Sequence, residues 1–254
     1  MPSSFHPIAR VVLTLGLAFG SIGLRAQDVA ETSRSVEIPD APSAVVTRPS
    51  HADNQEGEQT KRILGIIPNF RAVSADVTLP PLSWKGKFIA TTEDTFDYSD
   101  FVFFGLLAGI EQAQGSVPAF HQGAAGYGRY YWHTLADQAD ENYWVEFILP
   151  ATLHEDPRYY TLGHGGFLKR TAYSFSRTVI TRTDSGGESF NTSEVVGAGA
   201  AAGLSYLYYP SSEKTWTKTG QRWLTSVGLD AGVFVFREFW PDINRAVFHR
   251  HKRL

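Results

Sequence analysis

Apolar residues recur every three or four positions along most of the chain after residue 82, which is the period of an amphipathic helix. Residues that favour helix ends flank these segments. The pattern predicts six helices: Ser83 to about Thr92, Asp100 to Gln114 with Ser99 as its cap, about Tyr127 to Leu149, Phe167 to Thr181, Thr192 to a stop at Pro210, and about Ser212 to Trp240 with a stop at Pro241.

The same spacing assigns an inner face to the fourth helix. Phe167, Phe175 and Val179 fall on one side and are expected to point into the core. Arg170 and Arg177 fall on the other side and are expected to face solvent. An alternative for the end of this segment is a β-hairpin from Val179 to Glu194, turning at Ser185-Gly186-Gly187.

The ends of the chain have a different character. Residues 1–26 combine a basic residue, a short apolar run and a terminal alanine, which predicts a signal peptide cleaved before Gln27. Residues 27–61 are rich in Ser, Pro and acidic residues and predict a disordered leader. The remainder predicts one helical domain over 62–248 and a basic, solvated tail over 249–254.

Three helices carry glycine pairs spaced four apart, which places both glycines on one helix face. The pairs are Gly105 with Gly109, Gly199 with Gly203, and Gly228 with Gly232. Glycine costs about 1 kcal/mol relative to alanine in a helix, so its repeated use favours close approach between helices. The pattern predicts an all-α, glycine-rich bundle of about five to six helices after the disordered leader. The alternatives are a periplasmic bundle, a membrane-embedded bundle and a surface-associated bundle.

Composition narrows the function classes. The chain has 23 Lys and Arg against 26 Asp and Glu, and this acidic balance argues against a nucleic-acid-binding protein. It has no cysteine, which excludes disulfides and thiolate chemistry in an exported protein.

Several segments resemble those of an uncharacterised family of exported bacterial envelope proteins. They are Ile66-Ile67-Pro68-Asn69-Phe70-Arg71, His154-Glu155-Asp156-Pro157-Arg158-Tyr159-Tyr160, Thr181-Arg182-Thr183-Asp184-Ser185-Gly186, Tyr208-Tyr209-Pro210 and Glu238-Phe239-Trp240-Pro241-Asp242. The resemblance implies an envelope location and a single helical domain, and it brings no activity with it.

The densest polar cluster is His154-Glu155-Asp156-Pro157-Arg158. A zinc protease motif needs a second histidine four residues after the first, and Arg158 stands there. The alternative is a catalytic or metal-binding loop site formed by His154, Glu155 or Asp156, and His164. No metal and no cofactor are expected. The simpler interpretation is that Arg158 pairs with a carboxylate.

Carboxylates also lie within or beside the most apolar helices: Glu111, Glu194, Asp230 and Glu238. Buried carboxylates need charged or hydrogen-bonding partners, and arginines such as Arg182 are available. These carboxylates, Arg158 and Arg182 are candidate binding residues. We expect such a network to orient the helices more often than to bind a ligand.

The sequence therefore favours an exported protein of the periplasm or outer membrane with a structural or binding role, associated with membrane lipid or another envelope protein. The alternative is an envelope lipid or glycan hydrolase that uses carboxylate and histidine chemistry. Acidic and histidine side chains that converge in an open cleft would favour the hydrolase, whereas fully paired charges between helices would favour the structural role.

Overall fold

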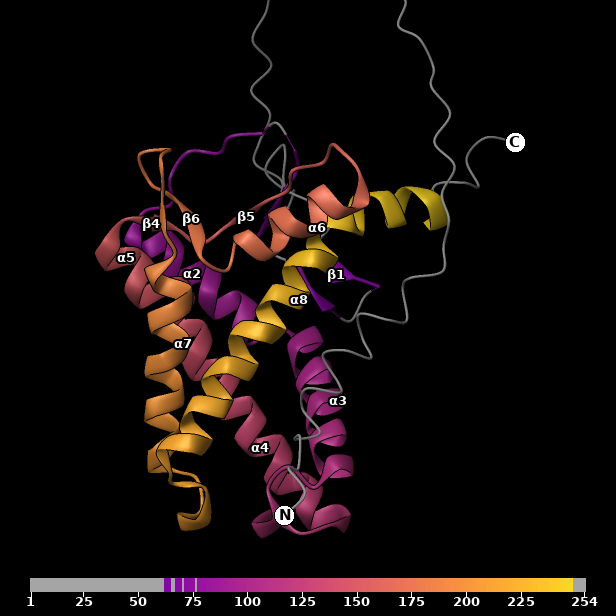
Figure 1. Ribbon diagram of the computed structural model, residues 1–254, viewed down its shortest axis with the longest axis vertical. Helices are drawn as coiled ribbons and strands as arrows, with labels where there is room; N and C mark the ends of the chain where they lie inside the picture. The colour runs from indigo at the N-terminus through magenta and orange to yellow at the C-terminus, as the bar shows by residue number, and fades with distance from the viewer. Residues whose placement is uncertain (1–61, 65–66, 70, 76, 249–254) are drawn as a thin grey trace, which may run out of the picture.

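A computed structural model describes residues 62–64, 67–69, 71–75 and 77–248 (Figure 1). Over this part the chain forms an all-α helical bundle, which confirms the predicted fold class. The expected signal peptide, leader and basic tail lie outside the described residues.

The bundle is built from helices that succeed one another through short connections. They are α2 (Trp84–Thr95), α3 (Tyr98–Gln114), α4 (Gly123–Asn142), a π-helical segment (Tyr143–Ile148), α5 (Leu149–Leu153), α6 (Phe167–Ser176), α7 (Thr192–Leu204) and α8 (Trp216–Phe248), with 3₁₀ turns at Pro118–Phe120, Ser205–Leu207 and Ser211–Glu213. Helix α3 packs on α4, while α6 and α7 both pack on the long α8, which crosses the molecule diagonally (Figure 1).

Strands β4, β5 and β6 lie at one end of the bundle, whereas β1 lies lower, beside α8 (Figure 1). All the strands are short. They are β1 (Arg62–Ile63) antiparallel to β2 (Ile67–Pro68), β3 (Ala72–Val73) parallel to β5 (Tyr159–Tyr160), and the antiparallel set β4 (Glu155–Asp156), β6 (Ile180–Thr183) and β7 (Glu188–Phe190). The hairpin β6–β7 confirms the alternative for this segment, and the helix expected to reach Thr181 ends at Ser176. The β-branched run around Val179 favours a strand, and Gly186 supplies the positive φ of the turn.

Other helix boundaries differ from the prediction as well: α7 ends at Leu204 and is followed by a 3₁₀ turn, and α8 begins at Trp216. Helix α8 continues through Pro241 to Phe248 instead of stopping. A proline removes only one helical donor, and the buried neighbours Glu238 and Trp240 fix this turn to the rest of the molecule. The third predicted helix is interrupted by the π-helical segment, a feature that commonly lies beside functional sites.

The faces of α6 are the reverse of the prediction. The side chains of Phe167 and Phe175 are 64% and 53% exposed, and Val179 is exposed as well, whereas Arg170 and Arg177 are each only 8% exposed. Arg170 points inward because it binds the fully buried Glu238, and it also binds Asp242. Arg177 binds Glu188, which is 63% exposed, and its guanidinium lies 5.3 Å from the centre of the Tyr173 ring.

Helix α2 shows the same inversion, and α3 shows it in part, because α3 also buries Phe104 and Ala108. The buried residues of α2 are all polar: Lys87, Thr91, Asp94 and Thr95. The exposed ones include Trp84, Phe88 and Ile89. On α3 the exposed positions Val102, Leu106 and Ile110 follow one another at four-residue steps and form an apolar stripe. In the part of the chain that the structure describes, no helix is both long and apolar enough to cross a membrane.

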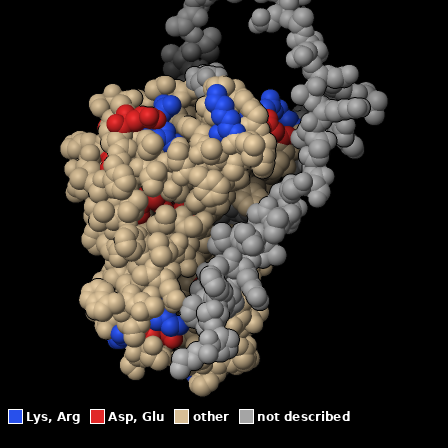
Figure 2. Space-filling view, viewed as in Figure 1, with Lys and Arg blue, Asp and Glu red and all other residues tan. Residues whose placement is uncertain are grey.

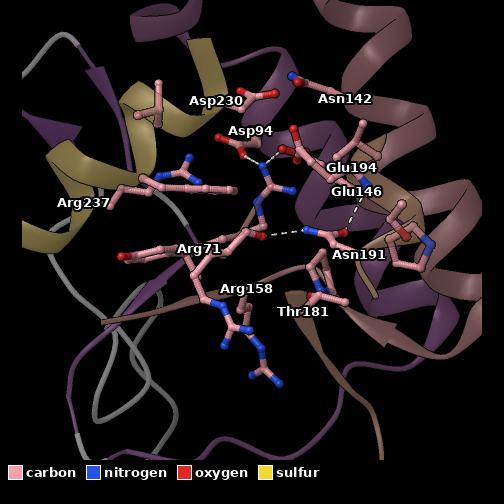
Figure 3. A pocket seen from close by; sticks show the side chains of 18 of the residues that line it. Arg71, Asp94, Asn142, Glu146, Arg158, Thr181, Asn191, Glu194, Asp230 and Arg237 are labelled. Carbon is pink, nitrogen blue, oxygen red and sulfur yellow. Dashed lines mark hydrogen bonds and ion pairs between the residues drawn. The ribbon is translucent and has the colours of Figure 1, made fainter. Parts of the chain in front are cut away.

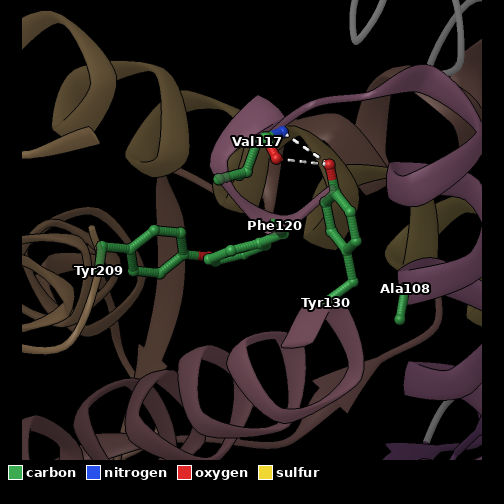
Figure 4. Packing of buried hydrophobic residues seen from close by; sticks show 5 residues of the cluster. All are labelled: Ala108, Val117, Phe120, Tyr130 and Tyr209. Atoms are coloured by element: carbon green, nitrogen blue, oxygen red, sulfur yellow. Dashed lines mark hydrogen bonds between the residues drawn. The ribbon is translucent and has the colours of Figure 1, made fainter. Parts of the chain in front are cut away.

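The apolar core is small (Figure 4) and lies around the connection between α3 and α4, at the end of the bundle opposite β4 to β6 (Figure 1). It joins Ala108 of α3, Val117, Phe120, Tyr130 of α4 and Tyr209. The Tyr130 hydroxyl is buried with them, and it both donates to the Val117 carbonyl and accepts from the Val117 amide, each at 2.9 Å. The phenol therefore fixes the α3–α4 connection without an unpaired polar atom.

The paired glycines only partly support close helix packing. A Cβ on Gly105 would lie 3.2 Å from the Tyr127 hydroxyl, one on Gly109 would meet only Tyr127 at 3.9 Å, and one on Gly199 would lie 3.4 Å from Trp223. Three of the six would meet no atom within 4 Å: Gly203, Gly228 and Gly232. The expectation that all three pairs mark helix contacts is therefore wrong for half of these positions.

Gly197 of α7 has a tighter environment. A Cβ there would lie 3.0 Å from Val145 Cγ2 and 3.2 Å from the Val145 backbone nitrogen. We expect Gly197→Ala to lower the free energy of unfolding by about 1–3 kcal/mol, because α7 must move off the π-helical segment. Gly228→Ala is the matched control and should raise it by up to about 1 kcal/mol. Thermal unfolding followed by circular dichroism measures both, and a raised midpoint for Gly197→Ala would contradict this packing.

Candidate functional site

A cavity of about 120 Å³ lies inside the bundle below the strands (Figure 3). Its walls come from helices α2, α3, α4, α7 and α8, the π-helical segment and strands β4 to β6. The charged residues that line it are Arg71, Asp94, Asp100, Glu141, Glu146, Glu155, Asp156, Arg158, Arg177, Arg182, Glu194, Asp230 and Arg237. The cavity is thus surrounded by charge in the interior of the protein.

Arg71 occupies the centre of this charged interior. It lies just before β3, is buried, and forms ion pairs with Asp94 of α2 and Glu146 of the π-helical segment. Figure 3 shows these two carboxylates meeting the guanidinium from α2 and the π-helical segment. Arg71 therefore joins its own segment to α2 and to the π-helical segment. Removing one of these charges would leave another charge buried without its partner, which is costly.

A second group of charges comes from three different helices. Glu141 of α4, Glu194 of α7 and Asp230 of α8 are mutually close, and we call them the carboxylate triad. Burial, followed by the nearby Asp230 charge, raises the pKa of Glu141 to about 8. Burial likewise raises the pKa values of Glu194 and Asp230, and each of these two carboxyl groups affects the pKa of the other. Arg237 of α8 is the cation whose charge acts on both.

The cluster predicted from sequence forms the strand side of the cavity. Asp156 accepts hydrogen bonds from Arg158 Nε and NH2, both at 2.8 Å, and from the Tyr160 hydroxyl at 2.9 Å. This confirms that Arg158 pairs with a carboxylate. Glu155 accepts from both the amide and the hydroxyl of Ser193 at the start of α7. Asp156, Arg158 and Glu155 are therefore satisfied by structural partners.

Lys87 of α2 stabilises the segments that form the strand side of the cavity. Its ammonium is buried and donates to the carbonyls of Pro150 and Glu155 at 3.0 and 2.8 Å and to Asp184 at 2.7 Å. These three partners come from α5, β4 and the β6–β7 turn. One side chain thereby fixes the loop that carries Glu155 and Asp156.

The two candidate histidines lie apart from the cavity. His154 ends α5 in a left-handed conformation with an exposed side chain, and His164 is exposed in the loop before α6. Neither lines the cavity. Among the described residues, no group of three His, Asp or Glu side chains is placed to hold a metal ion.

Arg182 and Glu238, two more predicted binding residues, have different surroundings. Arg182 lines the cavity from β6, with its guanidinium 4.2 Å from the centre of the Tyr160 ring. Glu238 is completely buried beside the cavity, where its oxygens accept from Arg170 Nε at 2.7 Å and from the Tyr159 hydroxyl at 3.0 Å. Glu238 therefore has a structural environment, whereas Arg182 faces the cavity.

A second cavity of about 130 Å³ lies between α3, α4, α7 and α8. Glu111 lines it and accepts a hydrogen bond from Thr134 at 3.1 Å, and burial raises the pKa of Glu111 to about 7. Gln138 and Glu141 line both cavities. The polar interior thus continues along α4 from one cavity to the next.

Two tyrosines bind Asp137, a carboxylate that lines this second cavity. The hydroxyl of Tyr208 donates to one oxygen of Asp137 at 2.5 Å, and that of Tyr209 donates to the other at 2.6 Å. Burial is the main cause of the raised pKa of Asp137. The tyrosine pair of the Tyr208-Tyr209-Pro210 segment therefore has a structural partner.

Sequence reasoning missed several residues that line the first cavity: Arg71, Asp94, Asp100, Glu141 and Glu146. A usable signal was present for α4, where Asp137 and Glu141 are four residues apart on a helix that is otherwise rich in aromatic residues. Arg71 gave no comparable signal, because it lies in an irregular segment without a helical period.

The protein is an all-α bundle with many exposed apolar side chains on its helices and a cavity lined by charged residues. No protein-family model, no curated protein and no solved structure matched the chain.

Proposed function

We propose that the protein is a membrane-associated binding protein of the bacterial cell envelope. Its apolar outer faces contact lipid, and its polar interior binds a small ligand. The observation that carries this proposal is the inverted polarity of the helices, with charged side chains inside and large apolar side chains outside.

The surface distribution of charge supports lipid contact. On the face seen in Figure 2, the charged side chains gather near the two ends of the molecule and a broad band between them is nearly uncharged. Exposed apolar residues lie on most helices: Trp84, Phe88 and Ile89 on α2, Val102, Leu106 and Ile110 on α3, Trp132 on α4, Phe167, Leu168 and Phe175 on α6, Val196 and Leu204 on α7, and Trp216, Trp223 and Leu224 on α8.

This distribution favours lipid over a single protein partner. A protein partner covers one compact apolar patch, whereas here the apolar side chains are spread over most helices. Several are tryptophans, which are enriched where a protein meets the lipid headgroups. Charged groups in membrane proteins face the interior of the bundle and pair there, as Arg71 and Asp94 do.

The envelope location rests on the expected signal peptide over 1–26 and on the resemblance to exported bacterial proteins. Binding is preferred to hydrolysis because His154 and His164 lie apart from the cavity carboxylates. An acid and base pair needs its members within reach of one bound substrate. Among the described residues neither histidine lines the cavity, so the histidine and carboxylate pair named in the hydrolase alternative is not assembled there.

Lysine substitutions on the apolar stripe of α3 test lipid contact. We expect the triple variant Val102→Lys, Leu106→Lys, Ile110→Lys to lose at least about tenfold in vesicle binding, because each charge at a lipid-facing position costs about 2–3 kcal/mol. Co-flotation with vesicles of phosphatidylethanolamine and phosphatidylglycerol measures the bound fraction, and circular dichroism checks the fold.

The matched control adds the same charge at exposed polar positions. Ser185→Lys, Ser212→Lys and Thr217→Lys together should leave vesicle binding near that of the unmodified protein. Equal flotation of both triple variants and the unmodified protein would show that the α3 stripe does not meet lipid.

A further inference from the structure

The cavity has more negative than positive charge once its ion pairs are set aside. Arg71 is paired with Asp94 and Glu146, Arg158 with Asp156, and Arg177 with Glu188. What remains on the helical side is the carboxylate triad and Asp100 of α3, with Arg237 as their charged neighbour; the charge of Arg71 also acts on Asp230. Arg182 adds one positive charge on the strand side, so four carboxyl groups face two guanidinium groups and positive charge is in deficit when these carboxyls are ionised.

One triad oxygen is buried without a hydrogen-bond partner. Glu194 is 3% exposed, and its Oε1 accepts no hydrogen bond from any group in the described part of the chain. The side chain lines the cavity, and Figure 3 shows it beside Asp94, Glu146 and Asp230. A buried acceptor of this kind needs a donor, because an unsatisfied one costs about 1–3 kcal/mol.

Aromatic rings line the same cavity. Phe103 and Phe104 come from α3, while Tyr159 and Phe234 form a stacked pair with centroids 5.1 Å apart. Ring faces attract cations, and the attraction grows when the cation is removed from water. Carboxylates together with aromatic rings are therefore the surroundings that suit an organic cation.

We propose that this cavity binds a small organic cation with an ammonium or guanidinium group. The N–H groups of the cation donate to Glu194, Asp230 and Glu141, and the rings around it contribute cation–π attraction. The proposal deepens the proposed function, since it names the class of ligand, and it rests on the binding role given there.

The size of the cavity limits the ligand. A protein cavity of about 150 Å³ holds benzene, so 120 Å³ admits a cation of only a few heavy atoms. An organic cation is favoured over a metal ion because the triad, within the described ranges, is not arranged as a metal-ligand group. Ethanolammonium and methylguanidinium fit the size and the chemistry.

The cavity reaches the surface at β6. Its lining includes Ile180, which is exposed, and Thr181 and Arg182, which are half-buried. A cation can therefore arrive from solution or as the amine headgroup of a lipid. The shared chemistry is a primary ammonium group, and the experiment separates the two sources.

Protons compete with the cation for the triad. The charged groups that face it are Glu141 of α4, Glu194 of α7, Asp230 and Arg237 of α8, Arg71 before β3, Asp94 of α2, Asp100 of α3 and Glu146 of the π-helical segment. Because burial raises the pKa values of all three triad carboxyls, lowering the pH fills the site with protons. Cation binding should therefore weaken from pH 8 to pH 5.5.

The test is isothermal titration calorimetry on the full chain in neutral detergent at pH 8. The probes are ethanolammonium chloride and methylguanidinium chloride, each against sodium chloride at equal ionic strength. We expect saturable binding of at least one organic cation and none of sodium, at least about tenfold weaker binding for Glu194→Gln, and the same direction of change for Asp230→Asn. Asp242→Asn removes a carboxylate outside the cavity and should bind as the unmodified protein does.

Two results would overturn the proposal: no saturable binding of either organic cation, or unchanged affinity in both triad variants. If phosphatidylethanolamine in detergent displaces the bound cation, the ligand is a lipid headgroup. If it does not, the ligand is the free amine. Both results support an organic cation in this cavity. The triple lysine variant of α3 should still bind the cation in detergent, and Glu194→Gln should still float with vesicles. Loss of lipid contact and loss of cation binding are thus measured separately.

Discussion

Replacing Glu238 with alanine is expected to lower the free energy of unfolding by about 3–5 kcal/mol. Glu238 is fully buried, and its two oxygens accept from the Arg170 guanidinium and from the backbone amides of Leu162 and Gly163 at 2.8 and 3.0 Å. Alanine would leave a buried guanidinium and two amide donors without their acceptor. The loop between β5 and α6 would lose its attachment to α8.

Urea unfolding of the variant and the unmodified protein measures this change. Asp242→Ala is the matched control, because Asp242 also binds Arg170 but is 38% exposed. We expect it to cost less than about 1 kcal/mol. If both variants lost the same free energy of unfolding, burial of Glu238 would not make its ion pair with Arg170 more important for stability than that of Asp242.

Acidification from pH 8 to pH 5 is expected to stabilise the protein. Burial raises the pKa of Asp100 to about 8 and that of Glu141 to about 8, and it raises the pKa of Glu111 to about 7. In the unfolded chain these groups titrate near pH 4. Between the two values the folded protein holds protons that the unfolded chain releases, so stability falls as the pH rises toward 8.

The size of this effect follows from the number of groups. One pKa unit corresponds to about 1.4 kcal/mol, so even a partial contribution from three groups gives at least about 2 kcal/mol. The melting temperature should be about 5 °C higher at pH 5 than at pH 8. Glu141→Gln cannot titrate and should reduce the difference, whereas a melting temperature that rises with pH in the unmodified protein would contradict the assignment.

Helix positions could be predicted because capping chemistry is local. Ser83 accepts a hydrogen bond from the Gly86 amide at 3.1 Å, and Asn191 accepts from the Glu194 amide at 3.0 Å. The cap of α3 is Asp97 instead of the expected Ser99, whose amide donates to it. Such contacts span three residues or fewer, so the sequence alone indicates them.

The direction of each helix face could not be predicted in the same way. A period of 3.6 shows that Phe167 and Phe175 share one face and that Arg170 and Arg177 share another. It does not show which face points inward. That choice depends on contacts with other segments, above all on the fully buried Glu238 of α8, which binds Arg170; Glu188, which binds Arg177, is 63% exposed.

The candidate site was partly predictable for a related reason. Glu155, Asp156, Glu194 and Asp230 were identified because a carboxylate beside an apolar helix or a turn is conspicuous in sequence, and all four line the first cavity. Their grouping with Arg71 depends on tertiary contacts. No local pattern reveals that a residue before β3 lies between α2 and the π-helical segment.

The pairing of β3 with β5 has a consequence for the order of folding. The Thr161 hydroxyl donates to the Val73 carbonyl across 88 positions of the chain. Contacts between distant positions require the closure of a long loop, and they form more slowly than contacts within helices or hairpins. We therefore expect the segment that carries Arg71 to dock late, on helices that are already assembled. In that order of folding, one of the last segments to join the bundle completes its charged centre.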